Sequence, residues 1–329
     1  MTPGLRPREV AFTATAAVRG ALARVGRTED VRFSPDNRLL AIAGFERRVC
    51  LLLRVAIEAG SDGPVVVTDD FMEITSDGIG ELHGVDFIDG QTLAVANRDA
   101  GVAIIRLPPG APAGRKHRAD VLRHVGGGPF RRIRTPGSLA IGRLPAGQVA
   151  LFVCNNYAHR VTRHVTAPRF GYLNWRNDVL LRQGLDIPDG IALSGDGRWI
   201  AVSSHGTRDV KLYDAAARLG PDAEPAGVLR QANYPHGLRF TADDRHIVVA
   251  DAASPNLHVY ERGDGWEGGR DPVRSVTVLD EATFLRGRHN PEEGGPKGLD
   301  IDRTGRVVAV TCEEQQLAFF TLSSVLGNA

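Results

Sequence analysis

The sequence predicts an all-β protein, a six-bladed β-propeller with four-stranded antiparallel blades. A phrase of two short apolar strands joined by a tight turn recurs in six copies along the chain. The copies start at intervals of about 50 residues, the period expected of propeller blades. The 38 glycines and 19 prolines fit many short strands joined by turns. Because a small sheet cannot bury both of its faces alone, the copies are expected to stack around a shared axis.

The copy that begins at Gly190 shows the repeat most clearly. Ile191–Leu193 is expected to form the inner strand, Ser194–Gly197 a hairpin turn, Trp199–Val202 the second strand and Val210–Tyr213 the third. The six copies begin at Asp30, Gly84, Ser138, Gly190, Gly237 and Gly298. Fourth strands are expected between the copies, at Pro64–Thr68, Val179–Arg182, Gly227–Gln231 and Ser275–Leu279.

The two ends of the chain are expected to share the last blade. Residues 1–9 are interpreted as a disordered tail and residues 10–329 as a single propeller domain. Val10–Val25 carries enough β-branched and apolar residues for one or two strands, and the last copy ends after its third strand, Leu317–Leu322. A strand from Val10–Val25 is therefore expected to complete the last blade and close the ring, which leaves no open sheet edge.

Composition limits the partners and the compartment. A formal net charge of +1 provides no overall field for nucleic acid or an anionic membrane, so neither partner is expected. The three cysteines form neither a disulfide framework nor a C-x-x-C metal pair, which suits a reducing compartment. The sequence shows neither a signal-peptide core nor an apolar run of about 18 residues. We therefore expect a cytoplasmic protein with a small-molecule substrate, while a protein partner stays open.

Two long connections interrupt the repeat, over residues 107–136 and 263–295. The first contains several basic residues without interleaved aromatic ones, so we interpret it as a solvated loop in preference to a nucleic-acid or anion patch. The second is charged and long enough to cover one face of the propeller as a lid.

Functional residues are expected at one mouth of the channel, where inner strands begin and second strands end. The residues just before the inner strands are Glu29, His83, Gly137, Asp189, His236 and Lys297. The second strands end at Gly44, Asn97, Asn155, Ser204, Asp251 and Cys312, and Arg98, Asn156, His205 and Glu313 follow four of these ends. The candidate substrate-binding residues are Asn97, Arg98, Asn155, Asp251, Lys297 and Glu313. Channel linings without chemistry are also polar, so each residue could equally be a hydrogen-bonded liner.

The repeated P-x-G-(I/L)-x-(L/F/I)-x-x-D-x-R phrase, its six copies and the Glu that opens the first inner strand resemble the six-bladed propellers of the SMP-30/gluconolactonase group and related NHL and lactonase-like propellers. The resemblance implies a calcium ion on the channel axis, with Glu29 as one ligand. Asp189 stands where that family has an Asn, and His236 where it has an Asp. Since imidazole favours transition metals, Glu29, His83, Asp189 and His236 are closer to a zinc, iron or manganese site. The charge of Lys297 opposes a tight metal cage.

Three functions follow from these residues. The first is metal-dependent hydrolysis of a lactone or ester, in which Glu29, Asp189 and His236 hold the metal and His83 or His205 moves the proton. The second is a metal-independent lyase, cyclase or isomerase, in which Asp189 or Glu29 pairs with His83 or His236 as acid and base. The third is a propeller that binds a ligand or a partner protein and catalyses nothing.

Overall fold

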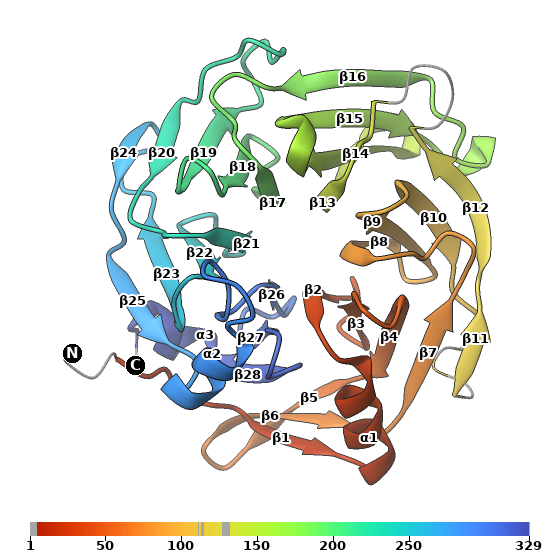
Figure 1. The fold of residues 1–329 in the computed structure, drawn as a ribbon, viewed down its shortest axis with the longest axis vertical. Helices are drawn as coiled ribbons and strands as arrows, with labels where there is room; N and C mark the ends of the chain where they lie inside the picture. The colour runs from red at the N-terminus through yellow and green to blue at the C-terminus, as the bar shows by residue number, and fades with distance from the viewer. Residues whose placement is uncertain (1–4, 111, 113–114, 127–131, 329) are drawn as a thin grey trace.

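The computed structural model describes residues 5–110, 112, 115–126 and 132–328. The protein is a β-propeller, in which sheets radiate from a central channel and most neighbouring strands are antiparallel (Figure 1). The predicted all-β propeller is therefore confirmed. The predicted number of sheets was wrong, because the described strands form seven sheets where the sequence predicted six.

Six of these sheets each place one strand beside the channel. These inner strands contact their neighbours in a closed ring, so residues at equal positions of the repeat reach the same level of the channel. The inner strands are β2 (Thr28–Phe33), β8 (Leu82–Asp89), β13 (Pro136–Leu144), β17 (Pro188–Leu193), β21 (Pro235–Phe240) and β26 (Leu299–Ile301).

From each inner strand the chain runs outward through antiparallel second and third strands. The second strands are β3 (Leu39–Gly44), β9 (Thr92–Asn97), β14 (Gln148–Asn155), β18 (Trp199–Ser204), β22 (His246–Asp251) and β27 (Val307–Val310). The third strands are β4 (Val49–Arg54), β10 (Val102–Arg106), β15 (Arg160–Thr166), β19 (Asp209–Asp214), β23 (Asn256–Glu261) and β28 (Ala318–Thr321).

Outer strands cover five of the six sheets. Three of the predicted fourth strands overlap the observed ones, with bounds that differ by up to three residues, and two sheets gain a short fifth strand that pairs in parallel. The fourth strands are β7 (Phe71–Thr75), β12 (Asp120–Val125), β16 (Arg176–Leu181), β20 (Gly227–Leu229) and β25 (Arg274–Thr277). The fifth strands are β11 (Lys116–Arg118) and β24 (Gly268–Arg270).

The hairpin turns repeat because their side chains hydrogen-bond to the backbone. Between β17 and β18, Ser194 Oγ accepts from the N–H of Trp199 at 2.8 Å and donates to Asp196 Oδ1 at 2.6 Å. Gly197 adopts a φ of 70°, which a residue with a Cβ tolerates poorly. The turn sequence therefore fixes where each inner strand ends.

Apolar side chains fill the space between neighbouring sheets. Between the sheets of β17 and β21, Trp199, Tyr260 and Trp266 are fully buried, which agrees with the packing role expected of propeller cores. A fully buried large apolar side chain contributes about 1.5–3 kcal/mol. This packing holds the inner strands, and with them the channel residues, in fixed positions.

The seventh sheet lies outside the ring and was not predicted. It consists of β1 (Ala11–Ala14), β6 (Gly63–Thr68) and β5 (Ala56–Gly60), with β1 parallel to β6 (Figure 1). Pro64–Thr68 was predicted to be a fourth strand of the first blade. That position is taken by β7, because the chain makes an extra hairpin of β5 and β6 before it returns to β4.

One strand of the one or two expected in Val10–Val25 is present as β1, but it pairs with β6 and does not complete the last blade as predicted. The rest of that stretch is a helix, α1 (Ala16–Val25). Thr15 caps it, since its Oγ1 accepts from the N–H of Val18 at 3.3 Å. The helix is rich in Ala, Leu and Arg, which favour helix, and its buried residues recur at helical spacing. The few β-branched residues of this stretch do not outweigh these helix-favouring residues.

The N-terminal segment just before β1 lies against the last sheet. The N–H of Val10 donates to the carbonyl of Phe319 at 2.9 Å, and the N–H of Thr321 donates to that of Arg8 at 2.9 Å. Leu5 forms a bridge with β25. Residues 5–9 are therefore paired, contrary to the predicted disordered tail, and residues 1–4 lie outside the described part of the chain.

Three helices and three short 3-10 turns complete the described part of the structure. In the described residues, no helix is both long and apolar enough to cross a membrane. The connection 263–295 contains β24, β25 and a short helix. The remaining helices are α2 (Glu281–Gly287) and α3 (Leu322–Leu326), and the 3-10 turns are η1 (Pro145–Gly147), η2 (Asn156–Ala158) and η3 (Pro168–Phe170).

Candidate functional site

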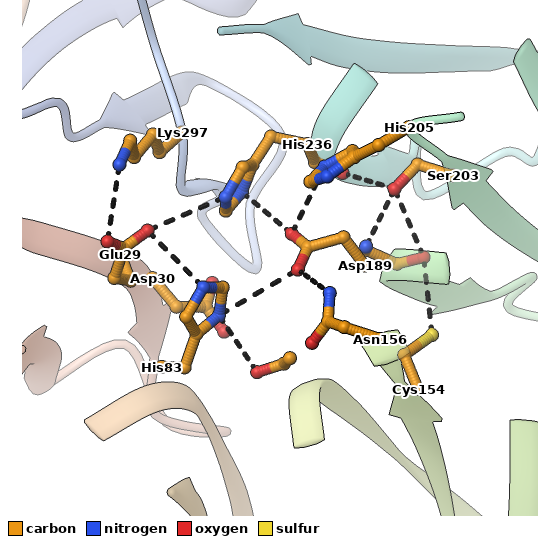
Figure 2. A network of polar contacts seen from close by, with 12 residues as sticks. Glu29, Asp30, His83, Cys154, Asn156, Asp189, Ser203, His205, His236 and Lys297 are labelled. Atoms are coloured by element: carbon orange, nitrogen blue, oxygen red, sulfur yellow. Dashed lines mark hydrogen bonds and ion pairs between the residues drawn. The ribbon is translucent and has the colours of Figure 1, made fainter. Parts of the chain in front are cut away.

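Four of the residues predicted at the start of the inner strands converge at one mouth of the channel (Figure 2). Glu29, His83, Asp189 and His236 are each the second residue of an inner strand, in β2, β8, β17 and β21. All four side chains are buried. Residues from four separate sheets thus form one cluster, as the alignment of the repeats predicted.

The glycines that follow His83, Asp189 and His236 let the inner strands come close together. A Cβ at Gly190 would overlap the carbonyl oxygen of His236, and one at Gly237 would lie 2.6 Å from that of Lys297. Ser203 links the same strands, because its Oγ accepts from the N–H of Gly190 at 2.6 Å and donates to the carbonyl of His236 at 2.8 Å. This close approach sets the spacing of the cluster.

Glu29 belongs to a buried ion-pair network. Its Oε1 contacts the guanidinium of Arg27 and lies 3.2 Å from Lys297 Nζ, which also contacts Glu313 at 2.9 Å and Glu293 at 2.8 Å. Burial raises the pKa of Glu29, but nearby positive charges, with Lys297 foremost, outweigh it and leave that pKa well below its usual range. Burial lowers the pKa of Lys297, and the surrounding carboxylates more than offset this. Both groups are charged at neutral pH.

Two hydrogen bonds hold His83 in a neutral form. Its Nδ1 lies 3.0 Å from the carbonyl oxygen of Gly137, and its Nε2 lies 2.5 Å from Arg98 Nη2. Because the carbonyl accepts and the guanidinium donates, this geometry assigns the proton of His83 to Nδ1. Burial, reinforced by Arg98, lowers the pKa of His83 to about 3. The role of His83 in proton transfer stays a prediction.

His236 lies between two carboxylates. Its Nε2 is 3.5 Å from Glu29 Oε2, and its Nδ1 is 3.1 Å from Asp189 Oδ2 (Figure 2). Asn156 donates to the other oxygen of Asp189 at 2.7 Å. Burial raises the pKa of Asp189, but the adjacent histidines and Arg98 outweigh it and keep that pKa well below its usual range. One imidazole therefore bridges two anionic groups.

His205, just after β18, completes the cluster. Its Nε2 lies 3.7 Å from Asp189 Oδ2, and its ring stacks on Tyr234 with centroids 3.8 Å apart. Burial lowers the pKa of His205 to about 4, so the ring is neutral at neutral pH. The backbone N–H of His205 donates to the carbonyl of Ile187 at 3.1 Å. Ile187 has a φ of 52°, which is unfavourable for a β-branched residue. Such backbone strain tends to occur at functional sites.

A pocket of about 440 Å³ opens beside His205 and Tyr234. Pro291 and Glu292 form part of its wall, so the connection 263–295 does reach this mouth. The next residue, Glu293, contacts Arg27 at 3.5 Å in addition to Lys297. This placement is consistent with the expectation that the connection covers one face of the propeller as a lid.

The cluster contains two groups of three possible metal ligands that share His236. One is Glu29, His83 and His236, and the other is Asp189, His205 and His236; within each group the ligand atoms lie within 4.8 Å of one another. The four predicted metal ligands thus lie together but divide between the two groups, and His205 joins the second.

The second group fits a metal ion better than the first. Both groups contain buried ligand atoms that make no hydrogen bond among the described residues, Glu29 Oε2 in the first and Asp189 Oδ2 and His205 Nε2 in the second. The ion-pair contacts of Asp189 Oδ2 are with His236 and His205, members of the same group. In the first group, Arg98 and Lys297 contact His83 and Glu29, and their positive charges oppose a cation. Two imidazoles and a carboxylate are a donor set that suits zinc, iron or manganese, whereas calcium prefers oxygen ligands.

Several predicted substrate-binding residues have other partners in the structure. Asn97 and Asn155 hydrogen-bond to loop backbone through both ends of their carboxamides, and Asp251 accepts from the N–H of Tyr234 at 2.8 Å. Lys297 and Glu313 pair with each other. Their part in substrate binding stays a prediction. Among the described residues, Arg98 is the one of the six that hydrogen-bonds to a histidine of the cluster, His83.

Sequence reasoning missed three residues of this mouth: Arg27, Tyr234 and Glu293. Arg27 and Tyr234 each stand two residues before a site residue, so the repeat alignment could have included them. Glu293 comes from the long connection, where no repeat indicates its position.

Comparison with known proteins supports the fold alone. No protein-family model matches the chain, and no curated protein matches it. The structure is similar to a crystal structure described as a candidate gluconolactonase, at 15% identity and a TM-score of 0.56, covering 90% of this chain and 89% of that chain. It is also similar to a protein of unknown function from Desulfotomaculum acetoxidans, at 13% identity and a TM-score of 0.58, covering 90% of this chain and 83% of that chain.

Proposed function

We propose that this protein is a metal-dependent hydrolase of a lactone or ester, with Asp189, His205 and His236 as the metal ligands. The observation that carries the proposal is the convergence of ligand atoms of Asp189, His205 and His236 within 4.8 Å of one another, where Asp189 Oδ2 and His205 Nε2 are buried and make no hydrogen bond among the described residues. Leaving such atoms without a partner is costly, and a cation would satisfy both. The fold similarity to a candidate gluconolactonase is compatible with a lactone substrate. Residues 10–329 as one domain and a cytoplasmic location belong to the same proposal.

A divalent ion held there would polarise the substrate carbonyl and make water more acidic. Neutral His205 and ionised Asp189 are already in the protonation states that ligation requires. The pocket beside His205 and Tyr234 provides the route by which a small molecule reaches them. Arg98, whose Nε is buried without a hydrogen-bond partner in the described residues, is positioned to bind a negatively charged oxygen of the substrate.

The second candidate is a metal-independent lyase, cyclase or isomerase. It is favoured by one observation, the position of His236 between Glu29 Oε2 and Asp189 Oδ2. An imidazole between two carboxylates is suited to hold and release a proton. In this reading Glu29 and Asp189 orient His236, which acts on the substrate.

Metal content and chelation separate these candidates. Protein purified without chelator should contain about one divalent ion per chain, and Asp189→Asn and His205→Asn should lose it. His164→Asn is a matched control, since His164 is also buried but hydrogen-bonds to Asn177 in β16, away from the cluster. Its metal content should be unchanged.

Activity on a panel of lactones and esters should vanish after chelation and return with added metal. Turnover that persists in chelator but is lost in His236→Asn supports the acid–base candidate. Protein without metal and without turnover on the panel overturns both and leaves a binding propeller.

A further inference from the structure

The inner strands carry a second level of channel-lining residues, three positions after the first. This level faces the opposite mouth, where the hairpin turns lie. Its residues are Arg32, Asp86, Ala140, Ala192, Arg239 and Asp300. With neighbouring residues they line a pocket of about 340 Å³. None of the residues of this pocket belongs to the cluster of Glu29, His83 and Asp189.

Positive charge exceeds negative charge in the wall of this pocket. Its four arginines, Arg32, Arg143, Arg239 and Arg303, face two aspartates, Asp86 and Asp300. Asp30, behind the wall, contacts Arg32 at 3.0 Å. Arg32 is buried and Arg239 nearly so, whereas Arg143 and Arg303 are exposed. The attraction of Arg32 and Arg239 for an anion is therefore less weakened by water than that of the two exposed arginines.

Arg239 is incompletely paired. Its Nε donates to Asp300 Oδ1 at 2.9 Å, but its Nη2 is buried and has no hydrogen-bond acceptor in the described part of the chain. The nearest carboxylate contact of Nη2 is Asp30 Oδ1, at 3.8 Å, which is too long for a hydrogen bond. A guanidinium presents several donors in one plane and binds carboxylates well, so this unused donor indicates where an anion would sit.

The opposite wall is small and apolar. Ala140 and Ala192 stand where other inner strands carry Arg or Asp, and Phe87 and Leu193 lie beside them. The two alanines leave the space that the pocket occupies. A ligand for it needs a negative group on one side and an apolar body on the other.

We propose that this second mouth binds a small organic carboxylate, with its carboxylate on Arg239 and Arg32 and its apolar body against Ala140 and Ala192. This inference does not depend on the proposed hydrolase activity, because no residue is shared between the two sites. The ligand is a binding partner of the propeller, and no chemistry is assigned to it.

Titration calorimetry with benzoate tests the proposal, with benzamide as the uncharged probe of the same shape. Benzoate should bind saturably to the wild-type protein, and benzamide at least about tenfold more weakly, a difference of about 1.4 kcal/mol. Asp189→Asn should bind benzoate as the wild type does, which separates this site from the proposed metal site.

Two variants address the two walls. Arg239→Gln should weaken benzoate binding at least about tenfold. Ala192→Leu should abolish benzoate binding, because the larger side chain fills the pocket while all charges stay in place. This variant still tests the proposal if Arg239→Gln fails to fold. Arg230→Gln, which breaks an exposed ion pair with Asp271, is the control and should not change binding. Equal binding of benzamide, unchanged binding in Ala192→Leu, or no benzoate binding at about 10 mM, well above a Kd of 1 mM, overturns the proposal.

Discussion

Replacing Lys297 with Met should destabilise the protein strongly at neutral pH. Lys297 is fully buried and contacts three carboxylates, Glu29 at 3.2 Å, Glu293 at 2.8 Å and Glu313 at 2.9 Å. Without it, Arg27 is the one lysine or arginine in the described part of the chain that contacts all three. Breaking a buried ion pair by removing one partner costs about 3–5 kcal/mol, because the other charge stays buried and uncompensated. We expect a loss in this range at pH 7, measured by urea denaturation.

The loss should depend on pH with a definite sign. The pKa values of Glu29 and Glu293 are lowered in the folded protein, so their contribution to stability is present above their ordinary value of 4.5 and is lost as the pH falls through the folded pKa. Removing Lys297 raises both pKa values, which lets these carboxyl groups take up protons at mildly acidic pH. The difference in stability between wild type and variant should therefore shrink below about pH 5.

Lys211→Met is the matched control. Lys211 is also buried but contacts one carboxylate, Asp209, at 3.0 Å. Its loss should be clearly smaller than that of Lys297→Met. A double variant, Lys297→Met with Glu29→Gln, should recover part of the lost stability. Equal losses for the two lysine variants, or a loss for Lys297→Met that does not change with pH, would refute the reasoning.

Three further predictions concern the strands, the histidines and the thiols. Gly190→Ala should lower the melting temperature and the site's activity, because the added Cβ overlaps the carbonyl oxygen of His236, whereas Gly220→Ala, which meets no atom within 4 Å, should leave both unchanged. Arg98→Gln should raise the pKa of His83 from about 3, followed by NMR titration, since Arg98 is the largest contributor after burial; an unchanged value contradicts this cause. Burial raises the pKa of all three cysteine thiols, so an aromatic disulfide reagent at pH 8 should label none in the native protein and all three after denaturation.

The sequence predicted the parts of the fold that repeat. The inner strands, the hairpin turns and the convergence of Glu29, His83, Asp189 and His236 follow from aligning the copies, because equal positions in a propeller reach equal levels of the channel. The seventh sheet could not be predicted this way, since β5, β6 and α1 occur once and have no counterpart in the other copies.

The chemistry of the site was less predictable than its position. Alignment of the repeats indicates which residues face the channel, but not which residues they contact. The contacts of Lys297 with three carboxylates and of His83 with Arg98 were therefore found only in the structure. The same limit explains the second mouth. The charged residues of the inner strands that end there, Arg239 among them, have partners that the alignment does not reveal, such as Asp300.

The attachment of residues 8–10 to β28 has a consequence for how the protein is made. The partner of this early segment is synthesised about 310 residues later, with sequence separations of that size among the slowest contacts to form. Until β28 has been synthesised, the backbone of Val10 lacks its hydrogen-bond partner in that strand. The sheet of β28 can be completed only after β28 has been synthesised, so the pairing of residues 8–10 with it is a late step of folding.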